Sequence, residues 1–420
     1  MVTLTTEQQS KMDDILCWYV VADGPLTLGG YAGTGKTTLL GHLQQSLDAA
    51  SGFGRKPRVV FASYTGKAVS VLRKKLPPGS EAMTLHRLLY RPRQIEVCAY
   101  TSEPVERKYD SNGQLVTLCE THCDETESCE VKKKVDFTPS AFPLEGIDLV
   151  VVDEASMVTE KIWADLTSHG VPILAVGDHG QLPPIRSDFD LMRKPDIRLE
   201  KILRQAADNP IIKMATMARL SGRIPLGDYG NNCIKLPPYK RMSVVTKLHP
   251  ERGDITLCAM NRTRVDMNDK LRNLMLGVER GVDPQINDIV ICLRNNYEAG
   301  VFNGIRGRVV SYEPPSGDYD PYAVFRTPSA MAEIDILDDD YSYRGAISAT
   351  QFREQKTQSD TPRSLGLWDY GYCLTVHKAQ GSEAERVLVI EERLPKIDYA
   401  RWLYTAVTRA SRTLCVVGPA

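Results

Sequence analysis

Short apolar runs divide the chain into two groups of expected strands. The first group comprises residues 26–28, 59–62, 149–152 and 173–176, each bounded by polar residues or by glycine and proline. Helical patterns lie between some of these runs. Because strands that alternate with helices usually form a buried parallel sheet, this part of the chain is predicted to be an α/β domain.

The second group of apolar runs lies further along the chain, at residues 255–260, 372–376, 386–390 and 413–417. The same reasoning predicts a second α/β domain there. A length of 420 residues agrees with this, because it exceeds what one hydrophobic core usually fills.

Two stretches interrupt the pattern. Residues 93–140 carry many charges and four of the ten cysteines, and they fall between two strands of the first domain, so we interpret them as an insertion. Residues 283–360 contain short strand-like runs at 288–293, 306–312 and 322–326, separated by glycine and proline. These runs predict a small antiparallel β module inserted into the second domain.

Composition narrows the class of protein only slightly. The hydrophobic content of 42% and the charged content of 25% are typical of a globular protein without membrane spans. The N-terminus lacks a secretory signal and no CxxC pair occurs, so we expect a reducing cytoplasm, or the host cytoplasm for a phage protein. With a net charge of −1, a nucleic-acid partner would require a local basic groove.

A glycine-rich segment with the order strand, turn, helix predicts a nucleotide site. Gly30, Gly33 and Gly35 allow the backbone to curl so that its N–H groups face phosphates, and the following helix presents its N-terminus to the same anion. Lys36 is expected to reach the terminal phosphates, and the Thr37 hydroxyl to ligate Mg²⁺. The segment therefore predicts binding of ATP and Mg²⁺.

Polar residues after two of the expected strands predict hydrolysis of that ATP. Asp153 and Glu154 follow the run 149–152, at the edge of the sheet where ligands bind in such folds. We expect Asp153 to hold Mg²⁺ and Glu154 to orient and deprotonate the attacking water. Gln181 follows the run 173–176 and is a candidate sensor of the γ-phosphate.

Taken in order along the chain, the motifs resemble those of superfamily 1 DNA helicases of the RecD-like and Dda-like branch. The ordered series is specific, whereas any single motif is weak. The segments that carry the resemblance are residues 4–8, 30–37, 62–68, 84–89, 153–157, 199–205, 258–264, 375–383 and 404–410.

The resemblance implies two RecA-like P-loop domains with parallel sheets and ATP between them. It also implies an insertion in the first domain that acts as a strand-separation pin, and an SH3-like β insertion in the second. By position, the first RecA-like domain is residues 1–92 with 141–192, and the second is residues 193–282 with 361–420. The insertion in the first domain is residues 93–140, and the SH3-like insertion is residues 283–360.

The resemblance also implies roles for individual residues. Gln8 would lie against the adenine, and Arg204 and Arg409 would face the γ-phosphate from the second domain, because arginine stays charged and offers a planar donor fork. The expected catalytic set is Lys36, Glu154, Gln181, Arg204 and Arg409. The expected nucleotide-binding set is Gln8, Gly30, Gly33, Thr34, Gly35, Lys36, Thr37 and Thr38, with Thr37 and Asp153 for Mg²⁺.

Phosphate contacts to a single DNA strand are expected at five further positions, with helix capping or core hydrogen bonding as the alternative for each. These are Thr65, Lys67, His86, Thr375 and His377.

The function implied is an ATP-dependent 5′→3′ DNA helicase, whose polarity rests on the resemblance alone. Its expected partners are single-stranded DNA, junctions of single- and double-stranded DNA, and single-strand-binding, replication or repair proteins, with no membrane. A single-strand translocase that displaces proteins but unwinds weakly is one alternative. An ATP-gated subunit of a recombination or repair complex is the other.

Cysteines and one histidine in the first insertion raise the question of zinc. Thiolates and imidazole are zinc ligands, but the spacings here differ from the usual tight pairs. Free thiols are the favoured interpretation and a zinc site is the alternative. The residues concerned are Cys98, Cys119, His122, Cys123 and Cys129.

Overall fold

The structure is a computed structural model whose described part falls into two compact units, Met1–Leu85 with Gly146–Ala420, and His86–Glu145. Of residues 92–94 and 132–138 only the backbone is described. The described residues are 3–21, 23–50, 54–98, 103–109, 114–120, 130–140, 143–184, 188–203, 208–245, 254–279, 281–296, 299–315, 329–337, 341–355, 361, 365–394 and 397–419.

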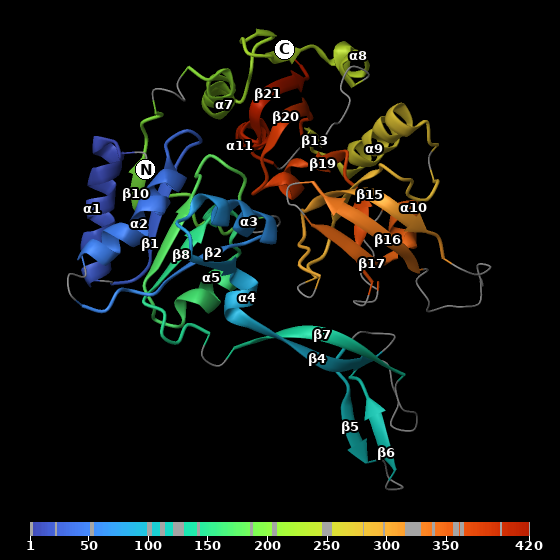
Figure 1. The fold of residues 1–420 in the computed structure, drawn as a ribbon, viewed down its shortest axis with the longest axis horizontal. Coiled ribbons are helices and arrows are strands. Elements are labelled where there is room, and N and C mark those ends of the chain that lie inside the picture. Colours follow the sequence, from blue (N-terminus) through green and yellow to red (C-terminus); the bar gives the residue numbers. More distant parts are fainter. Residues whose placement is uncertain are drawn as a thin grey trace. The chain divides into compact units, whose positions relative to one another are not determined.

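The first sheet of the larger unit has six parallel strands in the order β10-β1-β9-β8-β2-β3 (Figure 1). It contains all four strands expected in the first domain, which confirms the predicted parallel sheet. Its strands are β1 (Leu26–Gly30), β2 (Val59–Ser63), β3 (Glu81–Thr84), β8 (Leu149–Asp153), β9 (Ile173–Gly177) and β10 (Ile197–Leu199). The associated helices are α1 (Thr6–Val21), α2 (Lys36–Ala50), α3 (Gly66–Lys75), η1 (Ala155–Met157) and α5 (Glu160–Thr167).

Burial explains why these strands form as they do. Residues of β1, β2, β8 and β9 are almost all buried, as expected for parallel strands covered by helices on their faces. Leu28, Phe61, Val151 and Leu174 share one hydrophobic core with the leucines of α2. This core fixes the carboxyl ends of β1, β8 and β9 at one edge of the sheet, where polar residues follow each strand.

The second sheet has the strand order β11-β12-β21-β20-β13-β19 and is parallel except for the β11–β12 pair (Figure 1). It confirms the second α/β domain expected from the apolar runs. Its strands are β11 (Gly227–Asp228), β12 (Cys233–Leu236), β13 (Asp254–Cys258), β19 (Cys373–Thr375), β20 (Ala384–Ile390) and β21 (Ala410–Val417). Its helices are α7 (Pro210–Ser221), η2 (Pro238–Lys240), α8 (Arg241–Val245), α9 (Asn261–Leu276), η3 (Val376–Ala379) and α11 (Tyr399–Val407).

A five-stranded antiparallel sheet interrupts the second domain, in the order β17-β16-β15-β14-β18. Its elements are β14 (Ile289–Cys292), β15 (Arg306–Glu313), β16 (Ser329–Ile336), β17 (Ser342–Ser348), α10 (Ala349–Glu354) and β18 (Trp368–Tyr370). The expected runs at 288–293 and 306–312 become β14 and β15, and the expected run at 322–326 lies outside the described residues. Strand β18 pairs with β14 although it lies beyond residue 360, where we expected the insertion to end.

A buried ion-pair network joins this sheet to α9. The Arg272 guanidinium donates to both carboxylate oxygens of Asp288 at 2.9 Å, and the Tyr372 hydroxyl donates to the same carboxylate at 2.7 Å. The guanidinium also lies 4.5 Å from the Tyr370 ring centroid. Since a buried charge is tolerated only when it is fully paired, this network holds the sheet in one defined position against α9.

The smaller unit consists of two antiparallel strand pairs after α4 (Leu85–Leu89). Strand β4 (Tyr90–Cys98) pairs with β7 (Val131–Pro139), and β5 (Glu106–Tyr109) pairs with β6 (Leu115–Leu118). Cys98 and Cys119 pack together with Val105 as small apolar side chains. His122, Cys123 and Cys129 lie outside the described residues, and within the described ranges no three His, Cys, Asp or Glu residues are placed to hold a metal ion.

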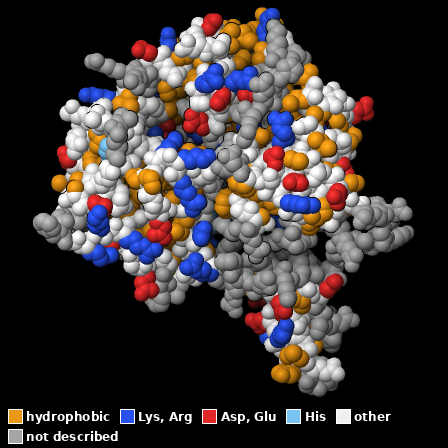
Figure 2. All heavy atoms as spheres, viewed as in Figure 1, with side chains coloured by type: hydrophobic (Ala, Val, Ile, Leu, Met, Phe, Trp, Pro, Cys, Tyr) orange, Lys and Arg blue, Asp and Glu red, His pale blue; other side chains and the backbone are white. Residues whose placement is uncertain are grey.

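Two surface properties complete the fold. Figure 2 shows acidic and basic side chains interspersed over the face in view, in keeping with the net charge of −1. Among the helices that the structure describes, none is both long and apolar enough to cross a membrane.

Candidate nucleotide site and its contacts with the second domain

The glycine-rich loop between β1 and α2 has the backbone geometry that phosphate binding needs. Gly33 and Gly35 both have φ of +82°, a left-handed conformation that residues with a side chain rarely adopt. A Cβ on Gly35 would lie 2.2 Å from Gln8 Nε2. The loop therefore curls tightly ahead of α2, which begins at Lys36, so that main-chain N–H groups and the helix N-terminus are available to an anion.

Two polar side chains complete the loop. The Lys36 ammonium donates to the carbonyl oxygens of Gly30 at 2.6 Å and Tyr31 at 3.2 Å, so it lies across the loop. Gln8 is buried, and its Nε2 donates to the Thr34 carbonyl at 3.2 Å while its Oε1 accepts from Thr5 N at 2.9 Å. Gln8 thus supports the back of the loop, and its expected contact with adenine stays a prediction.

The expected acidic pair lies at the carboxyl end of β8. Burial, with the neighbouring Glu154 charge as a second cause, raises the pKa of Asp153 to about 6, while a backbone hydrogen bond and the Lys36 and Lys75 charges oppose the rise. Glu154 has φ 53° and ψ 43°, a left-handed conformation that is uncommon for a residue with a side chain. Such backbone strain is typical of functional sites, where the surrounding fold maintains it.

We expect Asp153→Asn to stabilise the protein at neutral and alkaline pH. A folded-state pKa above the ordinary value means that the folded protein binds the proton more tightly than the unfolded chain, so stability is lost as pH rises through about 6. The neutral variant should gain about 1–3 kcal/mol at pH 8 and less at pH 5. Urea unfolding of both proteins without Mg²⁺ at the two pH values measures this, and an equal difference at both would contradict it.

Gln181 follows β9 at the same edge of the sheet. It is buried, and its Nε2 lies 3.4 Å from Asp178 Oδ2, while its Oε1 is a buried acceptor with no hydrogen-bond donor among the described residues. Because buried polar atoms are normally paired, this acceptor suits a water molecule or another donor brought with a ligand. The glycine-rich loop, Asp153 and Gln181 together suit ATP and Mg²⁺. Lys36 would bind the phosphates and Thr37 and Asp153 would hold the metal, and these roles stay predictions.

The second domain reaches this site through α11. The Tyr404 hydroxyl accepts from the Ala32 N–H of the phosphate loop at 2.8 Å and donates to Asp178 Oδ2 at 2.6 Å. One turn earlier, Arg401 donates to Asp190 at 2.6 Å and to the His179 carbonyl at 2.8 Å. These bonds join the second domain to both the phosphate loop and the segment that follows β9.

Thr405 and Gln380 add to the same contact. Thr405 Oγ1 accepts from the Leu182 N–H at 3.0 Å, and Gln380 Nε2 donates to the Leu182 carbonyl at 2.9 Å. Residues 401, 404 and 405 have the spacing of one helix face. That spacing was visible in the sequence, but only the fold shows that this face is turned toward the phosphate loop.

Comparison with known proteins agrees with this geometry. The family model described as an AAA domain matches residues 3–232, more than half of the chain. The chain belongs to the AAA domain family. The model described as a UvrD-like helicase C-terminal domain matches residues 370–417, which include η3, β20 and α11.

Individual relatives define the branch of this family. The chain is 29% identical over 381 residues to the ATP-dependent RecD2 DNA helicase of Deinococcus radiodurans, covering 84% of this chain and 46% of that protein. Its fold is similar to a Pif1 helicase structure concerned with unwinding of forked double-stranded DNA (TM-score 0.56, 17% identity, 100% of this chain and 92% of that one). It is also similar to Bacteroides Pif1 in complex with ADP-AlF3 and single-stranded DNA (TM-score 0.54, 16% identity, 100% and 93% covered).

Together, the family model and the RecD2 relative confirm the expected family, the RecD-like helicases of superfamily 1. The similarity to the Pif1 structures is one of fold. The chain spans less than half the length of the curated relatives that it matches.

The arginines of this AAA domain protein occupy different places. Arg409 is buried in the second domain, where it donates to the carbonyls of Thr405 at 3.1 Å and Ser382 at 3.2 Å. Arg204 lies outside the described residues. Arg219 of α7 was not expected at the site, yet its guanidinium lies 3.7 Å from the ring centroid of Tyr31 in the phosphate loop. No sequence motif marks α7, so only the fold could reveal this residue.

Two of the expected DNA-contact residues, Thr65 and Lys67, lie together at the start of α3 in the larger unit. Thr65 Oγ1 accepts from Ala68 N at 3.2 Å, so this hydroxyl caps α3, and Lys67 follows in the first turn. A Cβ on Gly381 would lie 3.3 Å from Thr65 Oγ1, which brings the segment after Thr375 against the same helix start. For Thr65, the structure shows helix capping, which was the alternative to a DNA contact. The contacts of these residues with DNA stay predictions.

The two histidines expected to contact DNA are partly buried. His377 lies in η3, and burial lowers its pKa. His86 belongs to the smaller unit, where its ring centroid lies 5.7 Å from that of Tyr90 and burial again lowers its pKa. Both imidazoles are therefore biased toward the neutral form, which would act through a hydrogen bond rather than through charge.

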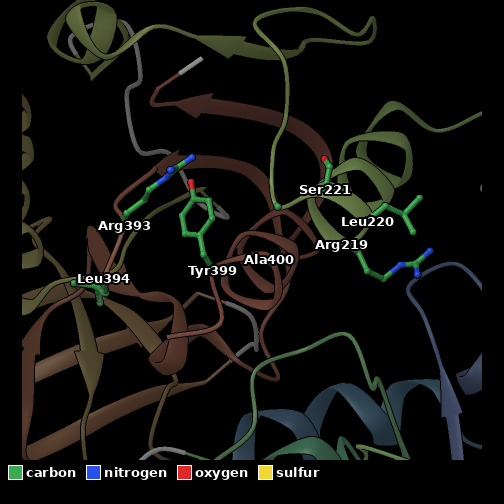
Figure 3. Close-up of a pocket in the computed structure, with 8 residues that line it drawn as sticks. Arg219, Leu220, Ser221, Arg393, Leu394, Tyr399 and Ala400 are labelled. Atoms are coloured by element: carbon green, nitrogen blue, oxygen red, sulfur yellow. The ribbon is translucent and has the colours of Figure 1, made fainter. Parts of the chain in front are cut away.

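A pocket of about 460 Å³ lies within the second domain and does not include the phosphate loop (Figure 3). It forms where the end of α7 meets the start of α11. In Figure 3 the Arg219 guanidinium points away from Tyr399 and Arg393. The residues that line the pocket are Arg219, Leu220, Ser221, Gly222, Arg393, Leu394, Tyr399 and Ala400.

Proposed function

We propose that the protein is an ATP-dependent DNA helicase that moves 5′→3′ along single-stranded DNA and unwinds duplex DNA. The observation that carries this proposal is that the Tyr404 hydroxyl of the second domain accepts from the Ala32 N–H and donates to Asp178, both in the first domain. A protein that moves along DNA by hydrolysing ATP needs such a connection between its hydrolysis site and a second domain that binds the DNA strand. The RecD2 helicase relative and the Pif1 structures with forked and single-stranded DNA support the same function.

The residues at the site suit hydrolysis of a phosphoanhydride. Bound ATP with Mg²⁺ supplies the γ-phosphoryl group and its activating charge. Lys36 binds the phosphates, Glu154 orients the attacking water and accepts its proton, and Gln181 senses the γ-phosphate. Arg409 and Arg204 stabilise developing charge from the second domain once the domains close.

The DNA strand is proposed to lie across both domains of the larger unit. Thr65 and Lys67 at the start of α3 and Thr375 and His377 around η3 contact its phosphates. His86 is proposed as a further phosphate contact. Alternate tightening of the contacts on the two domains, driven by closure and opening at the nucleotide, produces net stepping. The paired strands of residues 93–140 separate the duplex, and the five-stranded sheet takes the place of the SH3-like insertion.

Unwinding of a labelled duplex with either a 5′ or a 3′ single-stranded tail tests this function. We expect ATP-dependent strand displacement with the 5′ tail and little with the 3′ tail. Unwinding from the 3′ tail alone would reject the polarity. Removal of a protein block from single-stranded DNA without duplex unwinding would indicate the translocase, and ATP turnover that DNA does not stimulate would indicate the ATP-gated subunit.

A further inference from the structure

The Tyr404 hydroxyl lies where three segments of the chain meet. It accepts the Ala32 N–H at 2.8 Å, it donates to Asp178 Oδ2 at 2.6 Å, and it belongs to α11 of the second domain. The side chain is buried, and burial together with the Asp178 charge raises its pKa well above the ordinary value. The hydroxyl therefore keeps its proton and remains a donor to Asp178.

Packing accounts for the ring of Tyr404 but not for its hydroxyl. The ring belongs to the apolar core of the second domain, together with Trp402 and Leu403, and phenylalanine would fill the same space. A buried hydroxyl is unfavourable unless it is paired, so its presence in this core needs a reason beyond packing. A Cβ on Gly180 would lie 2.9 Å from the Tyr404 ring, which shows how closely the segment after β9 approaches α11.

Both partners of the hydroxyl are directly connected to the proposed chemistry. Ala32 lies in the loop between Gly30 and Lys36, so its N–H position is part of the curl that receives phosphates. Asp178 accepts from the Gly180 N–H at 2.9 Å, and its other oxygen lies 3.4 Å from Gln181 Nε2. A movement of α11 relative to the first sheet would therefore shift the phosphate loop and the segment that holds Gln181 at the same time.

We propose that Tyr404 is a positioning residue whose hydroxyl couples the phosphate loop and Gln181 to α11, so that nucleotide binding and DNA binding affect each other through this bridge. This inference rests on the proposed function. Coupling between two binding sites is reciprocal, so the same bridge that lets nucleotide alter DNA affinity lets DNA alter nucleotide affinity. Arg401 and Thr405 hold the same face of α11 in place but contact only the segment after β9.

The test compares Tyr404→Phe with Tyr399→Phe, a matched control on the same helix. The Tyr399 hydroxyl donates to Glu391 within the second domain, and among the described residues it makes no hydrogen bond to the phosphate loop. Its removal therefore deletes an equivalent group away from the bridge. The dissociation constant for a single-stranded oligonucleotide is measured by fluorescence anisotropy, with and without a non-hydrolysable ATP analogue. The ratio of the two constants is the coupling factor.

We expect Tyr404→Phe to reduce the coupling factor at least about fivefold and Tyr399→Phe to leave it unchanged. Hydrogen–deuterium exchange of the nucleotide-free protein gives a readout without any activity. Loss of the hydroxyl should speed exchange of the Ala32 amide by about five- to tenfold. Asp178→Asn, which weakens the other end of the bridge, should reduce the coupling factor as well, and the double variant should lose no more than the larger single effect.

Suppose that the nucleotide analogue changes the DNA affinity of the wild-type protein, but that Tyr404→Phe has the same coupling factor and the same Ala32 exchange rate as the wild type. That result overturns this inference and leaves the helicase proposal in place. If the nucleotide analogue does not change the DNA affinity of the wild-type protein, both this inference and the helicase proposal are overturned. If Tyr404→Phe lowers the melting temperature more than Tyr399→Phe does, the Asp178→Asn result decides, because an unchanged coupling factor in that variant rejects the bridge.

Discussion

Lys36→Ala is expected to reduce ATP turnover at least about a hundredfold, because it removes the cation that serves the terminal phosphates. In the structure the Lys36 ammonium donates hydrogen bonds to the Gly30 and Tyr31 carbonyls of the same loop. Its removal should therefore disturb little of the fold outside this loop. Phosphate release in the presence of saturating single-stranded DNA measures the loss. Affinity for single-stranded DNA without nucleotide should change by no more than about twofold, since no expected DNA contact is altered.

Lys11→Ala is the matched control for this prediction. Lys11 lies on α1 and pairs with Asp14 on the surface, so its removal deletes the same kind of side chain away from the loop. Turnover by this variant should equal that of the wild type. Equal turnover by Lys36→Ala would show that the loop from Gly30 to Thr37 does not bind the hydrolysed nucleotide.

Glu154→Gln should lower turnover by about two to four orders of magnitude while nucleotide binding is kept, because the amide cannot accept the proton of the attacking water. Glutamine has the same shape, so the left-handed backbone at this position is not disturbed further. The measurement pairs single-turnover hydrolysis with binding of a fluorescent ATP analogue. A variant that loses both equally would point to a structural role for Glu154.

Glu160→Gln provides the comparison for the second prediction. Glu160 is an exposed carboxylate in the first turn of α5, six positions along the chain from Glu154. Its conversion to the amide should leave hydrolysis within about twofold of the wild type. A large effect at Glu160 would mean that acidity in this region, rather than one carboxylate at the end of β8, controls turnover.

Some strands could not be predicted from the sequence because their residues are charged or do not alternate clearly between apolar and polar. Strand β16 alternates Ala330, Ala332, Ile334 and Ile336, which are buried, with less buried residues that include the apolar Met331. The alanines and this methionine made the alternation hard to see. Strands β4, β5 and β7 are rich in charges, and antiparallel pairing alone defines them. Strand β18 is short and joins the five-stranded sheet only because β14 offers it an edge.

The sequence by itself determined the two parallel sheets and the residues that end their strands. Buried β1, β8 and β9 read as apolar runs, and a glycine-rich loop, an acidic pair and Gln181 follow them at fixed spacing, so local order along the chain was sufficient. The tertiary structure alone decided which second-domain side chains reach that edge. Tyr404 and Arg219 come from helices far along the chain, and hydrogen bonds and ring contacts between distant segments depend on packing that no local pattern encodes.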